Sequence, residues 1–160
     1  IRYVLSTPQV PEFLTAREFL KFFIEINKES LQEEKEIDEY FDIVNLERED
    51  RNRLLKDFSH GMKNKMQMLI NIIASPKVLL LDEPLTSLDV VVAEEMKNIL
   101  RDLKHDRILI LSTHIMELAF DLCDEIVLLS QGELRAVSST LDEEELKTDI
   151  LRILQEEDHA

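Results

Sequence analysis

Glycine is almost absent from this sequence. Gly61 and Gly132 are the only two among 160 residues, although average usage of about 7% would give roughly eleven. A main-chain loop that wraps a phosphate group needs several glycines at fixed spacing, as in the pattern G-x-x-x-x-G-K-[ST]. This pattern cannot be written with two glycines so far apart, so the sequence contains no glycine-rich phosphate loop.

Cysteine and long apolar runs are also scarce. Cys123 is the only cysteine, which excludes an internal disulfide and is typical of an intracellular protein. Because Cys123 lies in a stretch with helical apolar spacing, we expect its side chain to be buried. The longest apolar runs, Val78 to Leu81 and Ile108 to Leu111, are far shorter than the ~18 to 20 residues that cross a bilayer. We therefore expect no membrane span in the chain.

Positive charge is outweighed by negative charge. There are 19 Lys and Arg residues against 34 Asp and Glu, which gives a net charge of -15, and such a surface repels the nucleic-acid backbone. Nucleic acid is therefore not an expected partner. The sequence starts at Ile1 without a signal-peptide pattern, and this start predicts a fragment of a longer domain.

The first 60 residues have a helical and highly charged pattern. Thr15 and Glu18 form a capping box that predicts a helix ending near Ile26. Ser30 and Glu33 repeat the capping pattern and predict the start of a second helix. We expect this part of the chain to be all-helical.

After residue 60 the pattern alternates between helices and strands. Apolar spacing predicts a helix from Met62 to Ile73. Val78 to Leu81 and Ile108 to Leu111 predict strands buried on both faces, with a helix capped by Asp89 between them. Strand, helix and strand in this order imply a parallel crossover, so we expect an α/β fold.

Shorter elements follow the second predicted strand. A helix is predicted over residues 115–123, a hairpin over 125–137, and an amphipathic tail helix from Thr140. The expected parts of the chain are 1–60, 61–137 and 138–160.

Two adjacent carboxylates, Asp82 and Glu83, end the first predicted strand in the segment Leu-Leu-Leu-Asp-Glu-Pro. Neighbouring side chains at a strand end point in different directions, so the two acids can do different jobs. The first is suited to Mg²⁺ and the second to orienting or deprotonating an attacking water. The alternative is an ordinary strand end that turns into solvent.

A histidine, His114, follows the second predicted strand in the segment Ser-Thr-His. Open α/β sheets place ligands beyond the carboxyl ends of their strands, so the imidazole is placed to donate a hydrogen bond to a phosphate oxygen. The alternative is a structural histidine at a strand end.

Ser59 and Gly61 lie at a predicted helix N-terminus, in the segment Phe-Ser-His-Gly-Met-Lys. Free N–H groups and the helix dipole favour anions there, and Lys63 and Lys65 are expected to add positive charge. The alternative is a serine N-cap beside a glycine turn.

These segments, in this order, resemble the ATP-binding subunits of ABC transporters. Residues 58–62 look like the family's signature, Leu79 to Pro84 like the Walker B strand with its catalytic glutamate, Thr86 to Asp89 like the D-loop, and Ser112 to His114 like the switch histidine. The resemblance covers residues 1 to about 137. It implies a partial P-loop NTPase (RecA-like) parallel sheet with an N-terminal all-helical signature subdomain.

The resemblance also implies roles for single residues. Asp82 would hold Mg²⁺, Glu83 would be the general base, and His114 would contact the γ-phosphate of ATP. Asp89 would signal between two ATPase subunits packed head to tail. In that dimer, each subunit's signature closes over the ATP that the other holds.

Three departures from the family pattern stand out. In the signature, Ser59 and Gly61 are retained for ATP binding, and the replacement of its other glycine and its glutamine resembles the branch that drives ABC-2-type exporters. Ser6 occupies the expected glutamine position of the Q-loop but is too short to reach Mg²⁺, and nearby Gln9 is a substitute. The phosphate loop, which precedes the Q-loop in the family, is missing.

The sequence therefore predicts an ATP-hydrolysing subunit that powers transport, in the export direction, through a separate membrane permease. It would be cytoplasmic and peripheral to the inner face of the cell membrane. Phe13, Leu14 and Phe19 are candidates for permease contact or, alternatively, a helix staple and local core. The other hypotheses are a non-transport ABC ATPase, such as a translation factor or DNA-repair protein, and a catalytically dead binding module. The isolated chain is expected to be inactive and to self-associate.

Overall fold

The computed structural model describes residues 1–31, 35–86 and 88–137, together with single positions between 144 and 152. These residues form two compact units, Ile1–Ser112 and Thr113–Ala160. The boundary follows the third strand, whereas the sequence led us to expect boundaries near residues 60 and 137. Helix α3, which starts at residue 60, packs on the helices before it and also on strand β1 and helix α4. The expected division into residues 1–60, 61–137 and 138–160 stays a prediction.

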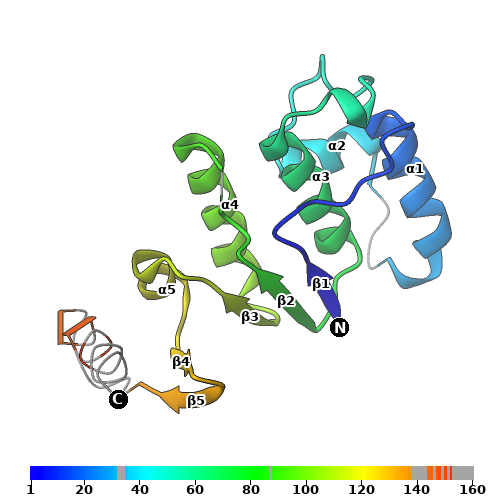
Figure 1. The fold of residues 1–160 in the computed structure, drawn as a ribbon. Coiled ribbons are helices and arrows are strands. Elements are labelled where there is room, and N and C mark those ends of the chain that lie inside the picture. Colours follow the sequence, from blue (N-terminus) through cyan, green and yellow to red (C-terminus); the bar gives the residue numbers. More distant parts are fainter. Residues whose placement is uncertain are drawn as a thin grey trace. The chain divides into compact units, whose positions relative to one another are not determined.

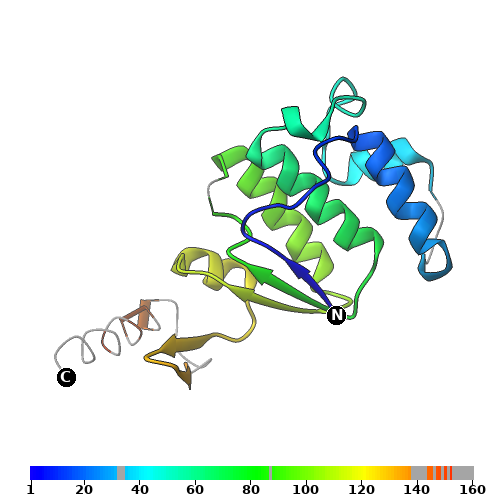
Figure 2. The ribbon, with the colours of Figure 1, turned by 45° about the vertical axis from the view of Figure 1, so that its right-hand side comes forward.

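The first unit is a parallel three-stranded sheet with helices on one face (Figures 1 and 2). In chain order its elements are β1 (Arg2–Val4), α1 (Ala16–Asn27), η1 (Lys28–Ser30), α2 (Ile37–Ile43), η2 (Leu55–Asp57), α3 (His60–Ile73), β2 (Val78–Asp82), α4 (Val90–Leu103) and β3 (Ile108–Ser112). The strand order is β1-β2-β3. Both views place α3 and α4 over the same face of the sheet, so the expected α/β fold is confirmed.

Local caps set the starts of the main helices. The Thr15 hydroxyl accepts from the Glu18 amide at 3.2 Å, and the Glu18 carboxylate accepts from the Thr15 amide at 2.9 Å, which completes the predicted capping box. Asp89 accepts from the amides of Val91 and Val92 at 3.1 and 3.0 Å. These two predicted helix starts are confirmed.

The predicted start of the second helix is wrong. Ser30 ends η1, and α2 begins only at Ile37, where the Glu36 amide donates to the Glu39 carboxylate at 2.8 Å. The later start occurs because this glutamate pair supplies the same kind of cap at Glu36, six residues beyond Ser30. Glu33 lies outside the described residues.

The core of the first unit lies between the helices. One cluster of buried residues comes mainly from α1, α2, η2 and α3, and its fully buried side chains include Leu20, Phe41, Leu55, Met66 and Leu69. Burying one such side chain contributes about 1.5–3 kcal/mol. This cluster therefore fixes the helices that precede and contain the candidate anion site.

The prediction that β3 is buried on both faces is wrong. Ile108 and Ile110 are 61% and 56% exposed, whereas Leu109 and Leu111, which alternate with them, are half-buried. In the described part of the first unit β3 is an edge strand, and the helices lie over one face only. In β2, Leu79 and Leu81 are buried and the alternate residues are half-buried.

The second unit contains α5 (Met116–Leu122) and an antiparallel hairpin of β4 (Val127–Ser130) and β5 (Glu133–Ala136). The hairpin is confirmed, and its two-residue turn has Gln131 and Gly132 at φ 48° and 82°, as a tight hairpin turn requires. Cys123 is half-buried rather than buried, because it follows the last turn of α5. Thr140, the expected start of the tail helix, lies outside the described residues.

Candidate functional site

The carboxyl ends of β2 and β3 meet at Asp82 and Ser112. These residues are paired in the parallel register, and the Ser112 hydroxyl donates to Asp82 Oδ1 at 2.8 Å. The next amide, that of Glu83, donates to the Ser112 carbonyl at 3.1 Å. Both predicted carboxylate residues therefore lie where the carboxyl ends of these two parallel strands meet.

Glu83 has a strained main chain. Its φ is 46°, in the left-handed region that costs a side-chain-bearing residue roughly 1–2 kcal/mol. Its carboxylate accepts from the Thr86 hydroxyl at 2.9 Å. Strain of this kind clusters at functional sites when the surroundings hold it in place, and here the Ser112 carbonyl and Thr86 hydroxyl do so.

The oxygen donors at Asp82 fit Mg²⁺. Mg²⁺ prefers oxygen ligands and takes only one or two carboxylates, completing its shell with water and substrate phosphates. Asp82 is half-buried and offers a carboxylate beside the Ser112 hydroxyl. The described residues include no group of three or more His, Cys, Asp or Glu side chains that could enclose a metal.

The predicted anion site lies at the N-terminus of α3. Ser59 is the N-cap, its hydroxyl accepts from the Met62 amide at 3.2 Å, and both Ser59 and His60 are exposed. A Cβ added at Gly61 would meet Val92 Cγ1 at 3.5 Å and Leu88 Cδ2 at 3.9 Å, which is ordinary contact. Packing therefore does not require a glycine here.

The expectation that Lys63 and Lys65 supply positive charge to this end is wrong. The Lys63 ammonium is 2.8 Å from the Glu12 carboxylate, and the Lys65 ammonium is 2.7 Å from that of Glu95. Each lysine charge is compensated by a carboxylate, so the helix dipole and free amides are what remain to attract an anion.

The loop that contains Ser6 is held by a residue that sequence reasoning missed. Gln67 on α3 accepts from the Gln9 amide at 3.2 Å and donates to the Leu5 carbonyl at 2.8 Å. Ser6 is half-buried and the Gln9 side chain is exposed. The sequence signal was a glutamine between two methionines in a mainly apolar helical segment, which also contains Asn71.

Asp89 and His114 are both exposed, and they belong to different compact units. Asp89 is exposed at the start of α4, next to Val90 and Val91, which are 85% and 70% exposed. His114 is exposed and belongs to the second compact unit, where the Thr113 hydroxyl accepts from the Ile115 amide at 3.1 Å. The grouping of His114 with the two carboxylates stays a prediction.

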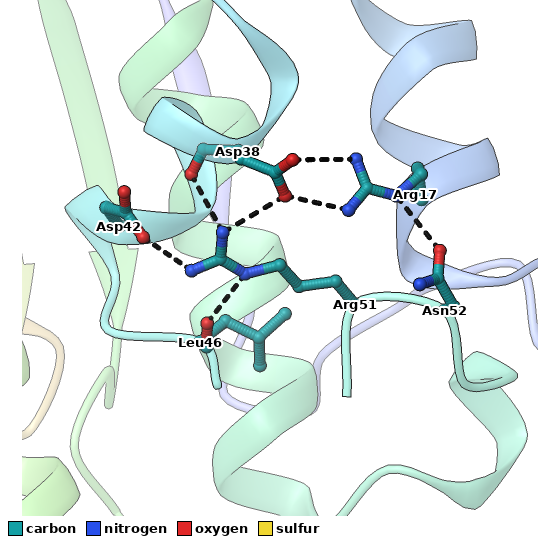
Figure 3. A network of polar contacts seen from close by, with 6 residues as sticks. All are labelled: Arg17, Asp38, Asp42, Leu46, Arg51 and Asn52. Atoms are coloured by element: carbon teal, nitrogen blue, oxygen red, sulfur yellow. Dashed lines mark hydrogen bonds and ion pairs between the residues drawn. The ribbon is translucent and has the colours of Figure 1, made fainter. Parts of the chain in front are cut away.

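A charged network fixes the segment that leads to Ser59 (Figure 3). Arg51 is 3% exposed and donates to the Leu46 carbonyl, to Asp38 and to Asp42, while Arg17 donates to Asp38 at 2.7 Å. The pKa of Asp38 is held below its usual value, mainly by the hydrogen bond from Arg17 and next by the hydrogen bond from Arg51. Burial acts to lower the pKa of Arg51, but its bonds to Asp42 and Asp38 outweigh burial and raise it.

The candidate permease contacts separate into core and surface. Phe19 is 9% exposed and belongs to the core cluster, with Leu14 packed against it, whereas Phe13 is 80% exposed. Within the described residues, no helix is both long and apolar enough to span a bilayer.

The chain is similar in sequence to ABC transporter proteins. The sequence profile of the family described as ABC transporter matches residues 1–86, which include both carboxylates, Ser59 and Gly61. Mouse "Phospholipid-transporting ATPase ABCA3" is 38% identical over 129 residues, covering 80% of this chain and 8% of the relative. The Bacillus subtilis "Uncharacterized ABC transporter ATP-binding protein YxlF" is 32% identical over 139 residues, covering 83% of this chain and 46% of the relative. The chain thus spans less than half the length of either.

Solved structures show the same fold. "Structure of ATP binding subunit of ABC transporter" superposes with a TM-score of 0.69 at 23% identity, over 93% of this chain and 67% of that one. "Dimeric structure of a post-hydrolysis state of the ATP-binding cassette MJ0796 bound to ADP and Pi" gives 0.68 at 19% identity, over 82% and 59%. The expected ATPase fold, a partial P-loop NTPase sheet with a helical part, is confirmed.

Proposed function

Because this chain belongs to the ABC transporter family, we propose that it is part of an ATP-hydrolysing subunit that powers transport through a membrane permease. The observation that carries the proposal is the paired end of β2 and β3, where Asp82 bonds to Ser112 and Glu83 is held at positive φ. One carboxylate placed for Mg²⁺ beside a second held in a fixed orientation is what phosphoryl transfer to water needs.

Each carboxylate has one role in the proposed reaction. Asp82 holds Mg²⁺, which when bound neutralises charge on the ATP phosphates. Glu83 takes a proton from water as the water oxygen attacks the γ-phosphorus, and the bond from that phosphorus to the ADP oxygen breaks. The Thr86 hydroxyl, 2.9 Å from the carboxylate, keeps this base oriented.

The remaining predicted residues contact the nucleotide or a second subunit. His114 would donate to the γ-phosphate, and Ser6 or Gln9 would take the place of the family's Q-loop glutamine. Ser59 and Gly61 present the α3 N-terminus to ATP held by a second ATPase subunit packed head to tail, and Asp89 signals across that dimer. The MJ0796 structure, which is described as dimeric and bound to ADP and Pi, supports a dimer of such domains.

The proposal places the subunit on the inner face of the cell membrane, driving export. The export direction rests on the signature variant, in which His60 and Met62 replace the usual glycine and glutamine and Lys63 follows. Hydrolysis also needs a phosphate loop, which these 160 residues do not contain, so the chain by itself is proposed not to turn over ATP. The proposal therefore concerns the protein in which these residues are joined to such a loop.

The test is a Glu83→Gln substitution in that whole protein. The amide keeps the size of the side chain but cannot take a proton, so turnover should fall by about 10²–10⁴-fold while ATP binding is preserved. Glu25→Gln, an exposed position on α1, is the matched control and should leave both unchanged. Undiminished hydrolysis by Glu83→Gln contradicts the proposal.

A further inference from the structure

Gln67 is a buried polar side chain in the middle of α3. It is 5% exposed, and its neighbours Met66, Met68 and Leu69 are 0%, 2% and 0% exposed. A buried amide that lacks partners costs about 1–3 kcal/mol. The position is therefore compatible with glutamine only because both ends of its amide are bonded.

Both partners are main-chain groups of one short loop. Gln67 Oε1 accepts from the Gln9 amide at 3.2 Å, and Nε2 donates to the Leu5 carbonyl at 2.8 Å. The amide thus bridges the two ends of the loop over residues 5–9, which contains Ser6. Glutamate offers no donor when ionised, and methionine offers neither bond.

The chain that follows the loop is attached to the same region. Glu12 pairs with Lys63 on the first turn of α3 at 2.8 Å. The Glu12 carbonyl also accepts from the Lys56 amide at 3.2 Å, and the Leu14 carbonyl accepts from the Leu55 amide at 2.9 Å. Residues 5–14 are therefore joined to α3 and to the segment that enters it.

We propose that Gln67 is a positioning residue that clamps the Ser6 loop to α3, so that this loop and the Ser59 end of the helix move as one body. A displacement at one of these two nucleotide contacts then shifts the other. The consequence for turnover rests on the proposed function, whereas the clamp itself does not.

Hydrogen exchange in the whole protein tests the clamp. Gln67→Met keeps the size of the side chain and removes both bonds, so the peptide over residues 5–12 should exchange at least about fivefold faster, as expected for the loss of one to two hydrogen bonds. Gln67→Glu keeps an acceptor for the Gln9 amide and should retain part of the protection.

The matched control is Asn71→Leu. Asn71 is 4% exposed on the same helix, and its amide donates to the Gln67 main-chain carbonyl at 2.8 Å. This variant removes a buried amide from α3 but leaves the clamp intact, so exchange over residues 5–12 should stay at the wild-type rate. Unchanged exchange in Gln67→Met, or equal acceleration in Asn71→Leu, overturns the proposal.

Steady-state kinetics test the consequence. Gln67→Met should lower kcat for ATP about tenfold with little change in KM, because the phosphate loop that binds ATP is untouched, and Gln67→Glu should lie between it and wild type. Normal kcat together with accelerated exchange overturns the positioning role. If the wild-type protein hydrolyses no ATP, the proposed function fails, and the exchange comparison still decides the clamp.

Discussion

The Lys65 ammonium lies 2.7 Å from the Glu95 carboxylate and donates to the Asn45 carbonyl at 3.0 Å. Lys65 is on α3, which starts after Ser59, and Glu95 is on α4, which starts after Asp89. The two side chains are 11% and 26% exposed. One partly buried ion pair therefore joins the two helices whose N-termini carry predicted site residues.

Lys65→Met should destabilise the first unit by about 2 kcal/mol, below the 3–5 kcal/mol for a fully buried pair because Glu95 keeps some contact with water. The double variant Lys65→Met/Glu95→Leu should recover most of that loss, since no uncompensated charge remains. Urea unfolding of both variants measures the two values. Equal stability of Lys65→Met and wild type contradicts this assignment.

Glu83 offers a test of main-chain strain that is separate from chemistry. Glu83→Gly and Glu83→Ala both remove the carboxylate and its bond to Thr86, but only glycine adopts φ near 46° without steric cost. The glycine variant should therefore be more stable than the alanine variant by about 1 kcal/mol. The comparison needs thermal or urea unfolding only, and an alanine variant of equal or greater stability argues against strain.

The parts of the fold that sequence predicted well are those set by near neighbours. The caps at Thr15, Ser59 and Asp89 bond to amides two or three residues away, so their patterns are visible in a short window. The hairpin turn at Gln131 and Gly132 is equally local. The parallel pairing of the two strands that end at Asp82 and Ser112 followed from the strand-helix-strand order of the sequence.

Distant partners account for what sequence reasoning missed. Gln67 bonds to Gln9 and Leu5, which precede it by 58 and 62 positions in the sequence. Lys63 pairs with Glu12, which precedes it by 51 positions. No local pattern distinguishes such a lysine from one free to attract phosphate. The exposed face of β3 was misjudged because a short apolar run reads the same whether one or both faces are covered.

Gly61 should tolerate a side chain without loss of stability. Gly61→Ala places a methyl in ordinary contact with Val92 and Leu88, and Gly61→Asp adds an acid to the first turn of a helix, which is favourable by about 0.3–1 kcal/mol. In the whole protein, however, the aspartate should reduce ATP turnover at least about tenfold by repelling phosphate. Unfolding and ATPase assays on both variants separate these effects, and a fully active Gly61→Asp contradicts the anion site.

The Asp38 network should make stability depend on pH. The pKa of Asp38 is lowered in the fold, first by the hydrogen bond from Arg17 and then by that from Arg51. A carboxyl that binds protons less tightly when folded stabilises the fold above its usual pKa of 3.8. That contribution is lost as the pH falls through the lower folded pKa.

Asp38→Asn should therefore lower the free energy of unfolding above pH 3.8 and flatten its decline at lower pH. The decline that remains includes Glu12 and Glu18, whose pKa values are lowered by hydrogen bonds from Lys63 and Thr15 respectively. Asp102→Asn, exposed on α4, is the matched control. Urea unfolding at several pH values decides, and identical slopes for wild type and Asp38→Asn count against the network.

The exposed face of β3 should drive self-association of the 160-residue chain. Ile108 and Ile110 project on one face of an edge strand in the described sheet, at 61% and 56% exposure, and such an edge pairs readily with a second copy. Ile110→Asp places a charge there and should shift the chain toward monomer in light scattering. Phe22→Asp, at an equally exposed position on α1 (55%), is the matched control for removing an exposed apolar side chain elsewhere. This variant should leave self-association unchanged. A monomeric wild-type chain at high concentration, or dissociation by Phe22→Asp alone, rules out β3 as the contact.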